Sequence, residues 1–249
     1  MNFVSNNSIY NVFAPKIAFK TTQNPNVQNQ NLRKDSFNSN PIYADFHDKN
    51  YITRLVQANP KIKETLAKNG IPLNVNIKEL EELKQGHLLQ TRIIAAKIYS
   101  ALPQELKQNI NLVDLQQAAM LHDYGKVLIP PKILNKNGAL TPEEKKIMEL
   151  HSELGAELLA QQGVKEEVVK LVKYHHQNSK GTGYPQFQKD DNFSIAAQII
   201  SVADKYSALV EARCYKEPLS REETLSKIKE DVDSGNLEKE IFEALKKVV

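Results

Sequence analysis

The chain has 249 residues, 41% of them hydrophobic, and a formal net charge of +3, which predicts a globular protein of one or two domains. Its single cysteine excludes a disulfide framework and is typical of a reducing compartment, so we expect a cytoplasmic protein. No apolar run approaches the roughly 18 residues of a membrane span, and the near-balanced charge predicts neither polymeric nucleic acid nor a membrane as a partner.

The first 45 residues differ in composition from the rest of the chain. They are rich in Asn, Gln, Ser and Thr, as in the run from Asn24 to Asn31, and their apolar residues follow no period. Such a segment cannot bury enough apolar surface to fold alone. We therefore expect a disordered polar tail over 1–45, which is one candidate docking segment for a protein partner, followed by a single domain over 46–249.

Amphipathic stretches follow one another from residue 46 onward, without a convincing alternating strand. Ile52, Leu55 and Val56 have helical spacing, and Thr141-Pro142 combines a capping residue with proline at the first helical position. The predicted fold class is therefore all-α. Helices are expected around 52–56, from Pro60 to Asn69, from His87 to before Pro103, over 112–123, from Pro142 through His151, and over 165–176, 193–213, 221–231 and 237–248.

Histidines and aspartates fall on these predicted helices beside residues that should face the core. A lone histidine in such a place is usually an ordinary core or surface residue, but the adjacent pairs His122-Asp123 and His175-His176 are harder to explain in that way. Burying several imidazoles and carboxylates together is costly unless a cation satisfies them. The candidate metal ligands are His87, His122, Asp123, His151, His175, His176 and Asp204.

The chemistry of these ligands narrows the choice of metal. Imidazoles and carboxylates without a thiolate suit first-row divalent ions such as Fe, Mn, Co, Ni or Zn, and they disfavour a closed structural zinc site. The ligands are too many for one ion that keeps an open position, but they suffice for two ions that share a bridging carboxylate. Because two-metal sites hydrolyse phosphate esters, the sequence predicts a binuclear hydrolytic centre.

The run His122-Asp123-Tyr124-Gly125-Lys126 resembles the HDxGK signature of the HD phosphohydrolase superfamily. Downstream, His175-His176 and the loop Gly181-Thr182-Gly183-Tyr184-Pro185 are similar in order and spacing to the HD-GYP subgroup, and the likeness extends over residues 85 to 230. The resemblance implies a helical bundle around a bimetallic or trimetallic centre, and hydrolysis of cyclic di-GMP. Leu83 stands where the trimetallic subset has a Glu, which favours two ions, Fe or Mn.

The same resemblance implies a role for each site residue. One metal would be held by His87, His122, Asp123 and Asp204, and the other by Asp123, as a bridge, with His151, His175 and His176. A hydroxide bridging the two ions would attack phosphorus in line with the leaving ribose oxygen. Lys126 would neutralise the scissile phosphate, while Arg213 and Lys216 would grip substrate phosphates.

The chain departs from the family pattern near the mouth of the site. Gln177 replaces the Glu that follows the histidine pair, Ser207 replaces an Asp, and Cys214 replaces a Pro. None of these is a proposed ligand, so the departures bear on substrate choice more than on reaction type. Tyr184 either packs its loop down or contacts a protein partner. Two alternatives stay open, an HD phosphohydrolase for another nucleotide phosphate ester and a non-catalytic signalling module.

Overall fold

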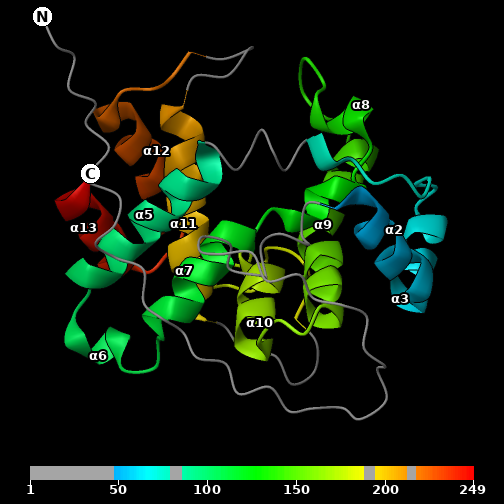
Figure 1. The fold of residues 1–249 in the computed structure, drawn as a ribbon. Coiled ribbons are helices and arrows are strands. Elements are labelled where there is room, and N and C mark those ends of the chain that lie inside the picture. The colour runs from blue at the N-terminus through cyan, green and yellow to red at the C-terminus, as the bar shows by residue number, and fades with distance from the viewer. Residues whose placement is uncertain (1–47, 79–85, 188–193, 212–216) are drawn as a thin grey trace, which may run out of the picture. The chain divides into compact units, whose positions relative to one another are not determined.

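Helices make up the regular secondary structure of the described part of the chain. The computed structural model describes residues 48–78, 86–187, 194–211 and 217–249 (Figure 1). Within these ranges the only β-type pairing is an isolated bridge between His176 and Tyr184, which confirms the all-α fold class. The disordered tail predicted over 1–45 falls outside the described residues, as do Leu83, Arg213, Cys214 and Lys216.

The predicted helices occur in the predicted order, but the helix predicted over 193–213 ends at Val210, and the described residues also form three short helices that the sequence did not predict, Gln104–Lys107, Tyr124–Leu128 and Pro131–Leu134. None of them, within the described ranges, is long and apolar enough to cross a membrane. Their bounds are α2 (Lys49–Ala58), α3 (Pro60–Lys68), α5 (His87–Ala101), α6 (Gln104–Lys107), α7 (Leu112–Leu121), the 3₁₀ helix η2 (Tyr124–Leu128), α8 (Pro131–Leu134), α9 (Pro142–Gln161), α10 (Glu166–Tyr174), α11 (Ile195–Val210), α12 (Arg221–Asp233) and α13 (Lys239–Val248).

Local capping explains where several of these helices begin. The Asp48 carboxylate accepts hydrogen bonds from the first backbone N–H groups of α2, and proline opens α3 directly after its cap, Asn59. Thr141 and Glu144 form a reciprocal capping box at the start of α9, which confirms the predicted helix start. The site-bearing helix α9 therefore has a fixed N-terminus.

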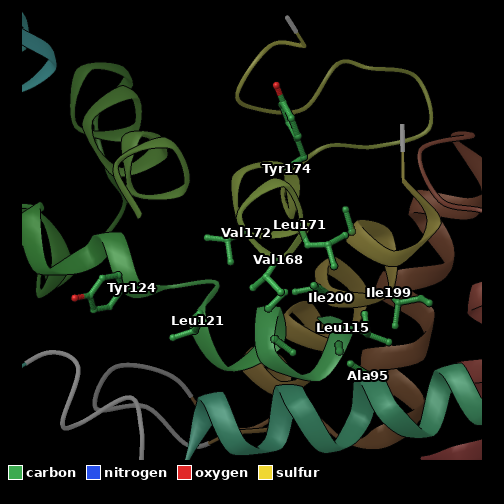
Figure 2. Packing of buried hydrophobic residues seen from close by; sticks show 14 of the residues in the cluster. Ala95, Leu115, Leu121, Tyr124, Val168, Leu171, Val172, Tyr174, Ile199 and Ile200 are labelled. Atoms are coloured by element: carbon green, nitrogen blue, oxygen red, sulfur yellow. The ribbon is translucent and has the colours of Figure 1, made fainter. Parts of the chain in front are cut away.

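The main core lies where α5, α7, α10 and α11 pack against one another (Figure 2). Ala95 of α5, Leu115 of α7 and Ile199 of α11 are fully buried there, and Val168 of α10 joins them. Such close packing restricts how these helices can shift relative to one another. The core thereby holds rigidly the helix ends that carry the site residues.

Two helix ends differ from the prediction in a way that matters for the site. The helix predicted over 112–123 ends at Leu121, His122 is its cap, and the backbone turns at Asp123 into η2. The helix predicted over 165–176 likewise ends at Tyr174, with His175 as its cap. His122 keeps helical backbone angles, and its Nε2 atom lies 3.4 Å from Oδ2 of Asp123, so both side chains reach the same site.

The backbone of η2 lies directly against the backbone of α9. A Cβ atom added to Gly125 would lie 1.9 Å from the carbonyl oxygen of His151 and 2.5 Å from the backbone nitrogen of Gly155. Only glycine permits this approach. The contact fixes the HDxGK segment, with Asp123 and Lys126, beside the helix that carries His151.

Candidate metal centre

All seven candidate ligands converge from five helices. They lie at the N-terminus of α5, at the C-terminal ends of α7 and α10, within α9, and within α11. Five of them are at least 94% buried, and the other two, His176 and Asp204, are partly buried. Two triads of these residues have their ligand atoms within 4.8 Å of one another. We call them the His87 group (His87, His122 and Asp204) and the His151 group (His151, His175 and His176).

The His87 group combines two imidazoles with a carboxylate. The Oδ1 atom of Asp204 lies 2.9 Å from Nε2 of His87 and 3.6 Å from Nε2 of His122. The ring of His122 is buried, and its Nε2 makes no well-formed hydrogen bond with any described residue. Because a buried polar atom normally has a hydrogen-bond partner, the lack of one suits this nitrogen to the role of a metal ligand.

The His151 group consists of neutral imidazoles. The Nδ1 atoms of His151 and His175 lie 2.7 and 2.6 Å from backbone carbonyl oxygens, so each carries its proton on Nδ1. The two Nε2 atoms lie 3.4 Å apart with no proton to share between them. Two lone pairs that face each other at this distance repel unless a cation binds them. His176 completes the group, with its ring centroid 4.0 Å from that of His175.

Asp123 lies between the two groups, and each of its carboxylate oxygens faces one of them. Its Oδ2 atom lies 3.4 Å from Nε2 of His122 and 3.9 Å from Nε2 of His87. Its Oδ1 atom lies 3.5 Å from Nε2 of His151. The two oxygens of Asp123 are thus directed towards different ligand groups.

The electrostatics of the site also favour cations. Burial opposes a charge on His122, but the Asp123 and Asp204 carboxylates outweigh it and raise the pKa of His122 to about 10. Burial lowers the pKa of His151 to about 4 and that of His176 to about 3, so both are neutral at pH 7 and available as ligands. Burial would raise the pKa of Asp123, but Lys126 and His122 hold it well below its ordinary value.

Lys126 lies beside the carboxylate of Asp123. Its Nζ atom is 2.7 Å from Oδ2 of Asp123, one helical turn earlier in the chain, and its side chain is 23% exposed. The ammonium group therefore combines a contact with the buried carboxylate and access to solvent. The predicted phosphate contacts Arg213 and Lys216 lie outside the described residues.

The loop from Gly181 to Pro185, which we call the GYP loop, packs against the His151 group. The ring of Tyr184 stacks on that of His176, with centroids 4.6 Å apart, so the tyrosine packs its loop down. Gln177, buried behind the loop, donates a hydrogen bond from Nε2 to the carbonyl of Pro185 and accepts one at Oε1 from the backbone N–H of Gly183. A carboxylate at position 177 could accept but could not donate. The amide that departs from the family pattern therefore suits this loop.

Glu211 is a site residue that the motifs did not reveal. It caps the C-terminus of α11, and its Oε2 atom lies 3.3 Å from Nδ1 of His87. An acidic side chain at the negative end of a helix is locally unfavourable. This conflict with local preference is the one sequence signal that could have pointed to it.

The fold and the site together define a class: an all-α protein with a buried histidine–aspartate centre suited to divalent cations. The family model for the HD domain matches residues 74–241, and the chain belongs to that family.

Relatives within this family agree with the resemblance of the motifs to the HD-GYP subgroup. A cyclic di-GMP phosphodiesterase of Thermotoga maritima is 36% identical over 55% of this chain and 38% of its own length. A 3'3'-cGAMP-specific phosphodiesterase of Vibrio cholerae is 36% identical over 44% of this chain and 21% of its own length. The chain thus matches less than half the length of each relative. A solved structure of an HDG"Y"P protein of Bdellovibrio bacteriovorus shares the fold, with 16% identity, a TM-score of 0.54, and coverage of 84% of this chain and 65% of the other.

Proposed function

We propose that this chain is a metal-dependent phosphodiesterase that hydrolyses a cyclic dinucleotide, with cyclic di-GMP as its substrate. The observation that carries the proposal is the position of Asp123, whose two oxygens face two separate ligand groups. Two-metal sites of this kind serve phosphate ester hydrolysis. The names of the two curated relatives support the substrate class, because both act on cyclic dinucleotides.

We propose two divalent ions, Fe or Mn, as the cofactors. The His87 group with Asp123 would hold one ion, and the His151 group with Asp123 would hold the other. The Nε2 atom of His122, which lies between the Asp123 and Asp204 carboxylates without a well-formed hydrogen bond, and the facing lone pairs of His151 and His175 support this assignment. Carboxylate and imidazole ligands match the preference of both metals.

When bound, the ions would lower the pKa of water and neutralise charge on the scissile phosphate. The protein's own groups prepare the site for that chemistry. The carboxylates of Asp123 and Asp204, ionised because their pKa values are lowered, would hold the cations at a position where the carboxylates alone would repel a phosphate diester. Lys126, partly exposed beside Asp123, adds a positive charge that can bind a phosphate oxygen as negative charge develops. Arg213 and Lys216 remain our proposed contacts to the substrate phosphates.

Tyr184 and Gln177 give this side of the site a fixed wall. The tyrosine ring covers His176, and the glutamine anchors the loop on both sides of the tyrosine. A preorganised wall positions a substrate without reorganisation during the reaction.

A substrate panel tests the proposal. The full chain, loaded with Mn²⁺ or with Fe²⁺ under anaerobic conditions, would be assayed with cyclic di-GMP, 3'3'-cGAMP, cyclic di-AMP and nucleoside monophosphates. We expect hydrolysis of cyclic di-GMP above the rest of the panel. Robust turnover of the monophosphates with the cyclic dinucleotides untouched would refute the proposal. Fewer than about one bound ion per chain would instead favour a non-catalytic module, because the two-metal chemistry could not operate.

A further inference from the structure

The imidazole of His87 is oriented differently from the other buried histidines of the site. His122, His151 and His175 each place Nδ1 within hydrogen-bond distance of the backbone carbonyl three residues earlier in the chain. His87 is the first residue of α5, so no helical carbonyl precedes it by one turn. Its Nδ1 is buried and makes no aligned hydrogen bond with a described residue.

Glu211 brings a carboxylate to this nitrogen from another helix. Its Oε2 atom lies 3.3 Å from Nδ1 of His87, while its backbone N–H is fixed by a hydrogen bond to the carbonyl of Ser207. The other oxygen, Oε1, lies over Gly86, where a Cβ atom would be 3.9 Å away. The carboxylate therefore lies along the start of α5, with its charge placed against the helix dipole of α11.

We propose that Glu211 is a positioning residue that holds His87 in the ligand orientation and raises the cation affinity of the His87 group. The Glu211 carboxylate, 3.3 Å from Nδ1, favours a proton on that nitrogen once a cation displaces the hydrogen bond between Nε2 and Oδ1 of Asp204, which are 2.9 Å apart, and so leaves the Nε2 lone pair for the cation. A carboxylate behind a ligand histidine also raises the basicity of the imidazole. The effect is confined to one of the two groups, because no ligand of the His151 group contacts Glu211 among the described residues. This inference rests on the metal centre of the proposed function, and on no property of the substrate.

Metal titration of the full chain tests the role of Glu211. Chelator-treated protein would be titrated with Mn²⁺ by calorimetry, and bound Mn²⁺ would be counted after dialysis. Glu211→Ala should weaken one of two binding steps by about 10- to 100-fold and leave the other step unchanged. Glu211→Gln should give a smaller loss, because the amide oxygen still accepts the proton while the charge is gone.

Glu157→Gln is the matched control. Its side chain is 26% exposed against 27% for Glu211, and it pairs with Lys61 instead of a candidate ligand. We expect wild-type titration for this variant, and unchanged urea midpoints for both metal-free Glu211 variants. Unchanged Mn²⁺ binding in Glu211→Ala, or equal weakening of both steps, would overturn the role of Glu211 alone. Failure of the unchanged protein to bind Mn²⁺ would refute the metal centre itself and this inference with it.

Discussion

Replacing Gly125 by alanine should disrupt both stability and the site, because the added methyl group would meet main-chain atoms. Its distance of 1.9 Å from the His151 carbonyl oxygen is about 1.5 Å short of ordinary contact, which begins near 3.4 Å. Overpacking that flexible side chains can absorb costs about 1–3 kcal/mol. Here the backbone of η2 or α9 has to move, so we expect a loss of about 3 kcal/mol or more in the free energy of unfolding. The same movement separates Asp123 from His151, now 3.5 Å apart.

Urea unfolding of the metal-free protein and metal analysis of the loaded protein measure the two effects of Gly125→Ala. The control is Gly70→Ala, where φ is +63° and no atom lies within 4 Å of the added methyl. The control should lose about 1–2 kcal/mol through backbone strain and keep its metal. Should Gly125→Ala unfold within about 0.5 kcal/mol of wild type and bind metal fully, the close backbone contact would be wrong.

The remaining predictions concern the bridge, the proton balance and the loop. Asp123→Ala should lose both bound metal and hydrolysis, and full activity in this variant would contradict the bridging role of Asp123. Lys126→Ala should retain its metal and slow turnover at least about tenfold. Because His122 has a raised pKa of about 10, it is protonated at pH 8, and metal binding should release about one proton from it to an indicator dye. In the metal-free protein the raised pKa of His122 adds to the free energy of unfolding, and this contribution is fully present below pH 6.5. The free energy measured by urea unfolding should therefore lose this contribution as the pH rises towards 10. Gln177→Glu should lower turnover but not metal content, since a carboxylate would repel the Pro185 carbonyl; unchanged kinetics would show that the amide does not anchor the loop.

The sequence could predict those features that depend on local chemistry and on motif spacing. The start of α9 follows from Thr141-Pro142 and a nearby glutamate, and the cap geometry confirms it. Four of the seven candidate ligands form two adjacent polar pairs where core residues are expected, and His87, His151 and Asp204 lie beside residues that are expected to face the core. The structure brings all of these ligands together.

The sequence could not predict features that depend on contacts between distant segments. Neither glycine nor proline marks the end of α7, so the sequence predicts a helix that continues through Asp123, where the structure has a turn. The packing of η2 on α9, which requires Gly125, favours the turn. Glu211 contacts His87 only because the end of α11 packs beside the start of α5. The two residues are 124 positions apart in the sequence. Local propensity alone carries no information on such contacts.

Anomalous scattering from crystals of the Mn²⁺-loaded chain tests the central claim most directly. We predict two peaks about 3.5–4 Å apart, the usual spacing of two-metal sites, with one carboxylate oxygen of Asp123 directed to each. One peak should lie at the His87 group and the other at the His151 group. A single peak, or two peaks that do not share Asp123, would contradict the binuclear centre.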